Sequence, residues 1–246
     1  MPALLALDFD GVVCDAFDEC ALITWLGMHD LDPALTAPEH VRRLPADFVT
    51  RFRTVRDYAR RLDHFVAAHQ ESAGHIRSQA DFDALFSRLS PADTARFVTA
   101  ASVARNRLQT TQPDSWLGMH TLYPGIDDLL RHHKGNVVIV TAKDEESVRA
   151  ILDRHGLGHT VLEVHGECAD KAAAVRASAA RHGIAVDEVT FVDDNLDNVR
   201  QVAVTGARVL WARWGYHTPE HRAEAERAAV TAVDLDGLAA AVKEPS

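Results

Sequence analysis

Residues 3–13 read Ala3-Leu4-Leu5-Ala6-Leu7-Asp8-Phe9-Asp10-Gly11-Val12-Val13, an apolar run that ends in two carboxylates one residue apart. The run predicts a short buried strand, and Gly11 lets the backbone turn away directly after it. Where a strand ends, the backbone departs from strict alternation, so one carboxylate can bind a cation while the other faces a substrate. The segment therefore predicts a metal and phosphoryl-transfer site, although an isolated Asp-x-Asp is also a common turn signal.

Two later apolar runs also end in polar side chains. Residues 136–140 lead into Thr141, and residues 189–192 lead into Asp193 and Asp194. Each run has the length of a buried parallel strand and precedes a helical pattern, as in βαβ units. Because ligands of an open parallel sheet bind at the carboxyl ends of its strands, we expect these side chains to converge with the first acidic pair.

About a hundred residues between the first strand and the next contain no strand signal. Ser90 and Pro91 have the pattern of an N-cap followed by a first helical residue. The predicted helices, recognised by apolar residues spaced by threes and fours, cover residues 17–28, 48–66, 82–86 and 91–108. We therefore expect an all-helical domain of residues 15–119, inserted into a core domain of residues 1–14 and 120–246.

The composition of the chain argues against several classes of function. The 246 residues are enough for one core domain and a smaller second one, and 47% of them are hydrophobic, as in ordinary globular proteins. The 26 Lys and Arg against 36 Asp and Glu give a net charge of −10, which argues against a nucleic-acid or membrane binder. No stretch approaches the ~20 apolar residues of a membrane span, and the three cysteines lack a metal or disulfide spacing. We expect a cytoplasmic monomer or homodimer.

Together, these segments resemble the motifs of the haloacid dehalogenase superfamily of phosphatases and phosphomutases. The four similar segments, in the superfamily's order, are Asp8-Phe9-Asp10-Gly11-Val12, Val140-Thr141-Ala142-Lys143, Lys171, and Phe191-Val192-Asp193-Asp194-Asn195. Leu122-Tyr123-Pro124-Gly125-Ile126 is similar to the segment by which subfamily I members re-enter the core after a cap. The resemblance implies an α/β fold with a Rossmann-like, doubly wound parallel sheet, and a helical type-1 cap that closes over the active site and selects the substrate.

The resemblance also implies a magnesium-dependent phosphatase that hydrolyses a small phosphorylated metabolite. Asp8 would be the nucleophile and would form an aspartyl-phosphate. Asp10 would protonate the leaving oxygen and then deprotonate the attacking water. Thr141, Ala142 and Lys171 would bind the phosphoryl oxygens, with Thr141 and Lys171 counted among the catalytic residues. Lys171 has a second possible role, which is to offset the carboxylates so that Asp8 stays ionised.

The expected metal ligands are Asp8, the main-chain carbonyl of Asp10, and Asp194. Asp193 would bind through water or as an alternate ligand, because Mg²⁺ prefers few carboxylates and several waters. Many members of the superfamily have Gly-Asp in the fourth motif. The acidic pair here leaves open which aspartate contacts the metal.

Other activities use similar residues. A phosphomutase would use the same set and recapture the phosphoryl group, and the sequence does not separate it from a phosphatase. A phospho-accepting signalling module of the receiver type would carry its acidic pair on the first strand, whereas here Asp193 and Asp194 come last. A non-catalytic binding protein on the same scaffold is disfavoured, because the expected reactive residues are intact: Asp8, Asp10, Thr141, Lys171 and Asp194. A dehalogenase or phosphonatase is disfavoured, since those members lack the second aspartate that Asp10 provides.

Overall fold

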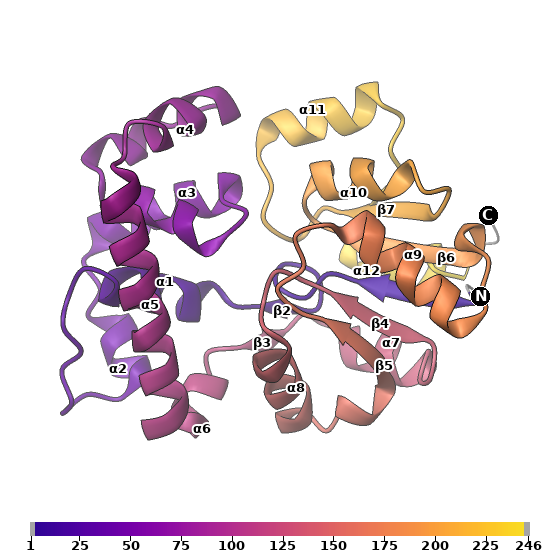
Figure 1. Cartoon of the computed structure of the whole chain (residues 1–246), viewed down its shortest axis with the longest axis horizontal. Helices are drawn as coiled ribbons and strands as arrows, with labels where there is room; N and C mark the ends of the chain where they lie inside the picture. Colours follow the sequence, from indigo (N-terminus) through magenta and orange to yellow (C-terminus); the bar gives the residue numbers. More distant parts are fainter. Residues whose placement is uncertain (1–2, 244–246) are drawn as a thin grey trace. The chain divides into compact units, whose positions relative to one another are not determined.

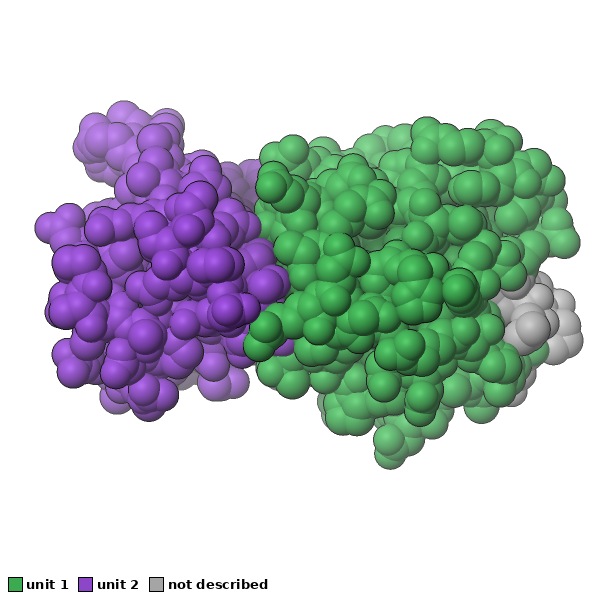
Figure 2. Space-filling model, turned by 90° about the horizontal axis from the view of Figure 1, so that it is seen from below, with its two compact units in different colours: residues 1–15, 121–246 green, residues 16–120 purple. Residues whose placement is uncertain are grey.

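The computed structural model describes residues 3–243 and divides the chain into two compact units (Figure 2). Unit 1 comprises residues 1–15 and 121–246, and unit 2 comprises residues 16–120. Unit 1 alternates strands and helices, whereas unit 2 is built from helices. Among residues 3–243, no helix combines the length and apolar character needed to cross a membrane.

Unit 1 is organised around a six-stranded parallel sheet in the order β5-β4-β1-β6-β7-β8. Its strands are β1 (Leu4–Leu7), β4 (Val137–Val140), β5 (Val161–His165), β6 (Val189–Asp193), β7 (Arg208–Ala212) and β8 (Ala232–Val233). Among these strands, Figure 1 labels β4, β5, β6 and β7. The two-residue strands β2 (Cys14–Asp15) and β3 (Thr121–Leu122) pair antiparallel where the chain leaves and re-enters the unit. The expected Rossmann-like, doubly wound α/β fold is therefore confirmed.

Helices connect the strands of unit 1, and one more helix follows the last strand. They are α7 (Ile126–His132), α8 (Glu145–Arg154), α9 (Lys171–His182), α10 (Leu196–Ala203), α11 (Pro219–Arg227) and α12 (Leu235–Ala241), with 3₁₀ turns η3 (Gly158–Thr160) and η4 (Val186–Glu188). Val175 of α9 and Val202 of α10 pack in one cluster with Leu4, Val138 and Phe191 of the sheet. Because crossovers between parallel strands are right-handed, the strand order predicts that α7 and α8 cover the opposite face. The strand order reverses at β1, so its carboxyl end is the expected position of a ligand site.

Unit 2 contains α1 (Phe17–Leu26), α2 (Ala37–Arg42), α3 (Ala46–Tyr58), α4 (Gln79–Phe86), α5 (Pro91–Thr111), α6 (Pro113–Leu117) and the 3₁₀ helices η1 (Leu62–His69) and η2 (Glu71–His75). The predicted cap of α5 is confirmed, because the Ser90 hydroxyl accepts a hydrogen bond from the Asp93 N–H. A buried ion pair joins α1 to α5, with Glu19 Oε1 2.7 Å from Arg105 Nε.

The prediction of one helix over residues 48–66 is wrong. Helix α3 ends at Tyr58, the backbone at Ala59 is extended with ψ 140°, and Leu62–His69 is a separate 3₁₀ helix. The Phe65 and Phe52 ring centroids lie 5.3 Å apart, so η1 packs back against α3. Both segments contribute to the same core, and this explains why their apolar spacing appeared continuous.

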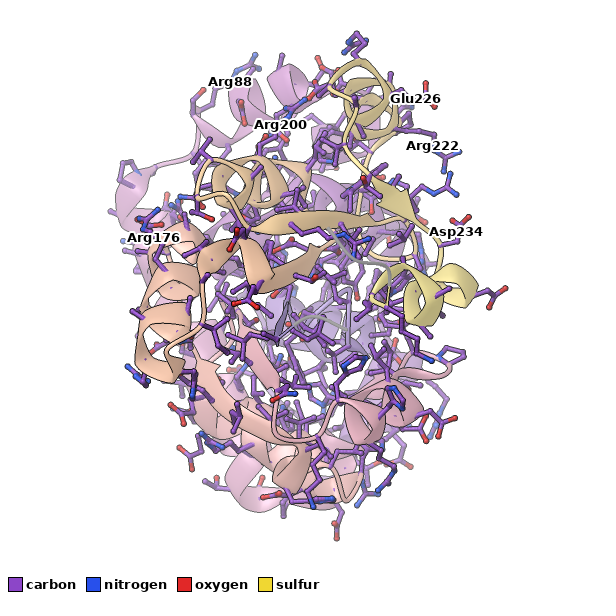
Figure 3. All side chains as sticks on the ribbon, turned by 90° about the vertical axis from the view of Figure 1, so that its right-hand side faces the viewer. Arg88, Arg176, Arg200, Arg222, Glu226 and Asp234 are labelled. Carbon is purple, nitrogen blue, oxygen red and sulfur yellow. The ribbon has the colours of Figure 1, made fainter. Side chains whose placement is uncertain are left out.

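Ion pairs fix the segments around β7. Arg200 Nη1 on α10 lies 2.8 Å from Glu224 Oε2 on α11, and Figure 3 labels Arg200 together with Arg222 and Glu226 of α11. Arg213, directly after β7, pairs with Asp234 at the start of α12. The loop that follows β7 is therefore anchored to the elements that come after it.

Candidate active site

Asp8 directly follows the central strand β1. Its N–H donates to the Val192 carbonyl of β6 at 2.9 Å, and its Oδ1 accepts a hydrogen bond from the Phe9 N–H at 2.7 Å. The chain then turns at Gly11, whose φ of +95° is in the region that favours glycine. This turn leaves Asp8 at the carboxyl end of β1, and its side chain is only 11% exposed.

Three buried carboxylates meet at this end of the sheet. Asp8, Asp193 and Asp194 each offer an oxygen, and these atoms lie within 4.8 Å of one another. The register of β1 and β6, in which Leu7 pairs with Val192, brings them together. Buried carboxylates repel one another unless cations are close. The donor set is that of a hard cation such as Mg²⁺, so the residues present fit the expected metal.

Lys171 supplies one cation. It is the first residue of α9, and its Nζ lies 2.9 Å from Asp8 Oδ1 and 2.8 Å from Asp193 Oδ2. Burial disfavours the ammonium, but the Asp193 and Asp8 carboxylates outweigh burial and raise the pKa of Lys171. Lys171 is therefore charged, and it holds two of the three carboxylates together.

Asp193 is enclosed by hydrogen-bond donors. Its Oδ1 accepts from the Asn195 N–H at 2.8 Å, and Asn198 Nδ2 lies 3.3 Å from Oδ1 and 3.1 Å from Oδ2. Burial raises the pKa of Asp193, and Asp8 adds to this, while Lys171 opposes both. Both oxygens of Asp193 therefore accept hydrogen bonds, and one of them contacts the Lys171 ammonium.

Asp194 is held by the loop after β7. Its Oδ2 accepts the Tyr216 N–H at 2.6 Å, and its carbonyl accepts the Trp211 indole N–H at 2.7 Å. A Cβ at either Gly11 or Gly215 would lie well under 3.0 Å from Asp194 Oδ2. Two glycines thus permit the carboxylate to occupy its place beside Asp8.

The residues after β4 lie at the same end of the sheet, because Leu7 of β1 pairs with Ile139 of β4. Thr141 is buried and its hydroxyl accepts the Lys143 N–H at 3.2 Å, whereas Ala142 is exposed. Asp10 is not part of the three-carboxylate cluster. Its Oδ2 lies 3.2 Å from Lys143 Nζ, and its Oδ1 is buried with no hydrogen-bond partner.

A model of haloacid dehalogenase-like hydrolases matches residues 2–203. The chain belongs to this family. The resemblance inferred from the sequence motifs is thereby confirmed. No protein with a curated description matches the sequence of this hydrolase.

Solved structures with the same fold match almost the whole length of this hydrolase. A haloacid dehalogenase-like family protein from Streptococcus pneumoniae is 14% identical, with TM-score 0.61 and 97% of each chain covered. A predicted phosphoglycolate phosphatase from Haemophilus somnus is 15% identical, with TM-score 0.66. A predicted phosphatase from Clostridium acetobutylicum is 12% identical, also with TM-score 0.66. The last two comparisons cover 98% of each chain.

The sequence motifs of this hydrolase did not reveal several residues that build the site. Lys143, Asn198 and Tyr216 contact Asp10, Asp193 and Asp194, respectively. Lys143 was within reach of sequence reasoning, because it stands two residues after Thr141 in a motif already recognised. Asn198 and Tyr216 carry no comparable signal, since their contacts depend on how α10 and the loop after β7 pack.

Proposed function

We propose that this hydrolase is a magnesium-dependent phosphatase that cleaves a small phosphorylated metabolite through an aspartyl-phosphate on Asp8. The observation that supports this most is the Asp8 carboxylate, which is buried beside the Lys171 ammonium and two further carboxylates. Such a group is a competent nucleophile toward phosphorus once cations offset its repulsion with phosphate. The names of the Haemophilus and Clostridium proteins also favour phosphate esters as substrates.

In the first step, an Asp8 oxygen forms a bond to phosphorus as the bond from phosphorus to the leaving oxygen breaks. Asp10 gives its proton to that leaving oxygen. In the second step, Asp10 takes a proton from water, the water oxygen bonds to phosphorus, and Asp8 is released with inorganic phosphate. Phe9 N–H and Lys171 Nζ both contact Asp8 Oδ1, so the nucleophilic carboxylate is held in one orientation.

Cations and dipoles around Asp8 would stabilise the charge on the phosphoryl group. Asp8, the carbonyl of Asp10 and Asp194 would hold Mg²⁺, which neutralises phosphoryl charge when bound. Asp193 would act mainly by anchoring Lys171, which its hydrogen bonds support. Thr141, the Ala142 backbone and Lys171 would bind the phosphoryl oxygens, and Lys171 would also keep Asp8 ionised.

A hydrolysis screen across phosphorylated metabolites, with and without Mg²⁺, tests the proposal. We expect release of inorganic phosphate that stops on chelation and is inhibited by Ca²⁺, whose looser coordination misaligns the nucleophile. Product analysis would detect a phosphomutase. Full activity after exhaustive chelation would contradict the metal requirement.

Two variants test the assignment of the aspartates. Asp8→Asn should abolish turnover and acid-labile phosphorylation of the protein, because an amide cannot supply the attacking oxygen. Asp10→Asn should lower hydrolysis by about 10²-fold or more, the usual size of general acid–base catalysis. Intact-mass measurement after exposure to an acyl phosphate distinguishes them. A phosphoryl adduct on Asp8→Asn, or wild-type turnover by Asp10→Asn, would reverse the roles.

A further inference from the structure

Lys143 is a buried cation without a role in the mechanism above. The chain has only four lysines, Lys134, Lys143, Lys171 and Lys243. Lys143 and Lys171 are buried, and each contacts one carboxylate of the Asp8-Phe9-Asp10 motif. The Lys143 side chain is only 2% exposed, and its Nζ lies 3.2 Å from Asp10 Oδ2. A lysine is rarely buried to this extent unless it is paired.

The backbone of Lys143 is fixed from two sides. Its N–H donates to the Thr141 hydroxyl, and its carbonyl accepts the Glu167 N–H at 3.0 Å. Glu167 adopts a φ of +49°, an uncommon conformation for a residue other than glycine. A Cβ at Gly166 would lie 3.0 Å from the Lys143 carbonyl oxygen, so the loop before α9 packs closely against this residue. Lys143 therefore presents its ammonium from a well-defined position.

The two oxygens of Asp10 are in different situations. Oδ2 contacts the Lys143 ammonium, whereas Oδ1 is buried and has no hydrogen-bond partner. A buried polar atom without a partner is rare in folded proteins and often marks a functional position. The Lys143 contact therefore fixes the rotation of the carboxylate and leaves Oδ1 as the oxygen that can exchange a proton.

We propose that Lys143 is the positioning residue for Asp10 and holds its Oδ1 in place for proton transfer to the leaving oxygen. This inference rests on the proposed phosphatase function. Lys143 acts through Asp10 and not through the phosphoryl group. The ammonium is a compact point charge, and it contacts a single oxygen of Asp10.

The proposal predicts a dependence on the leaving group. A phenolate leaving group needs a proton from Asp10 more than a nitrophenolate does, because the nitro group stabilises the negative charge. Loss of Lys143 should therefore slow phenyl phosphate more than p-nitrophenyl phosphate. A residue that binds phosphate, or one that only supports the fold, would slow both esters equally, since the phosphoryl group is the same.

The test compares kcat/KM for these two esters in Mg²⁺, because this ratio reports the steps up to transfer of the phosphoryl group to Asp8. We expect Lys143→Met to lower kcat/KM for phenyl phosphate about tenfold more than for p-nitrophenyl phosphate, a part of the 10²–10⁴-fold range of general acid catalysis. Lys134→Met, at an exposed lysine, is the matched control and should keep the wild-type ratio. The double variant Lys143→Met with Asp10→Asn should have the same relative kcat/KM for the two esters as Asp10→Asn alone, because both substitutions act on one proton transfer.

A second substitution keeps the test decisive if Lys143→Met does not fold. Lys143→Gln retains a hydrogen-bond donor of similar length without the charge, and we expect it to shift the ratio in the same direction by a smaller factor. Equal losses for the two esters, or a wild-type ratio in the folded variants, would overturn the proposal. If the wild-type protein released no phosphate from these esters or from any metabolite of the screen in Mg²⁺, the phosphatase function itself would fail, and this inference with it.

Discussion

Asp193 and Asp194 are adjacent in the sequence, but their carboxylates have different surroundings. Both oxygens of Asp193 accept hydrogen bonds from donors that include Lys171 and Asn198. The Asp194 carboxylate is instead oriented by the backbone N–H of Tyr216. A ligand carboxylate is commonly oriented by such a neighbouring hydrogen bond. The surroundings therefore favour Asp194 as the direct metal ligand.

We expect Asp194→Asn to weaken Mg²⁺ binding by about 100-fold or more, as loss of a ligand charge should exceed the 10–100-fold effect usual for an outer partner. Asp193→Asn should weaken it less and should instead loosen Lys171. Calorimetric titration of each purified variant with Mg²⁺ measures both dissociation constants. Equal losses in the two variants would contradict the assignment.

Lys171 should also contribute to stability. Lys171→Met leaves the buried Asp8 and Asp193 carboxylates without their shared cation, and breaking such a buried pair costs about 3–5 kcal/mol. We expect added Mg²⁺ to raise the melting temperature of this variant more than that of the wild type, because the metal would offset the same charge. Thermal melts of both proteins at several Mg²⁺ concentrations measure this. Lys134→Met, at an exposed site, should behave as wild type.

The loop after β7 positions the Asp194 carboxylate through backbone atoms. Gly215 is too close to Asp194 Oδ2 and to the Gly11 carbonyl to accept a Cβ without movement of one of them. The Tyr216 hydroxyl donates to Asp15 Oδ1 at 2.7 Å and so ties this loop to β2. The position of Asp194 thus depends on segments more than 180 residues apart in the sequence.

Gly215→Ala should therefore weaken Mg²⁺ binding by about 10-fold, within the range seen when a ligand's supporting contacts are lost. The matched control is Gly237→Ala, because a Cβ there meets no atom within 4 Å. Circular dichroism should show both variants folded, and calorimetric titration should separate them. Wild-type Mg²⁺ affinity in a folded Gly215→Ala would show that Asp194 is positioned by other contacts.

Strands β1, β4 and β6 were predictable because they are continuous apolar runs that end in polar residues. Strand β5 was not predicted, because at the sheet edge only two of its five residues are buried and it contains Glu163 and His165. Strand β7 is apolar, but it leads into no reactive group that would have drawn attention to it. The sequence therefore did not predict these two strands, because β5 lies at the sheet edge and β7 is followed by no chemical motif.

Some residues of the candidate site were likewise predictable from the sequence, and others were not. Asp8, Asp193, Asp194 and Lys171 stand at strand or helix ends, where parallel topology alone predicts convergence. Lys143 reaches Asp10 across 133 positions, through a loop whose conformation depends on backbone contacts with Glu167 and Cys168. Local sequence patterns do not encode such contacts.

The whole protein should lose stability in mild acid. Burial lowers the pKa of His64, His69, His133 and His165 in the folded state. At pH values between the lowered pKa of the folded state and the unfolded pKa of about 6.5, the unfolded chain binds more protons than the folded protein. The stability contributed by the neutral histidines is therefore present above pH 6.5 and is lost as the pH falls toward the folded pKa. The raised pKa of Asp193 acts in the opposite direction, but it is common to all the variants compared below.

Denaturant unfolding at pH 7.5 and 5.5 tests one of these histidines. His133 is buried and its Nε2 has no hydrogen-bond partner. His133→Gln should lose less stability than the wild type between the two pH values, because it removes one titrating group. His159→Gln, at an exposed histidine that does not contribute to the pKa shift of His133, should follow the wild type. An unchanged pH dependence in His133→Gln would exclude this contribution.

Unit 1 comes from two segments separated by residues 16–120, and this has a consequence for protein synthesis. Strand β1 leaves the ribosome first, but its neighbours β4 and β6 follow after Asn136 and Glu188. At about 5–20 residues per second, β1 waits on the order of 10 s or more for both partners. During that time Leu4, Leu5 and Leu7 have no sheet to cover them, so nascent chains are open to aggregation or chaperone binding. Chains stalled before β6 would contain Asp8 but neither Asp193 nor Asp194.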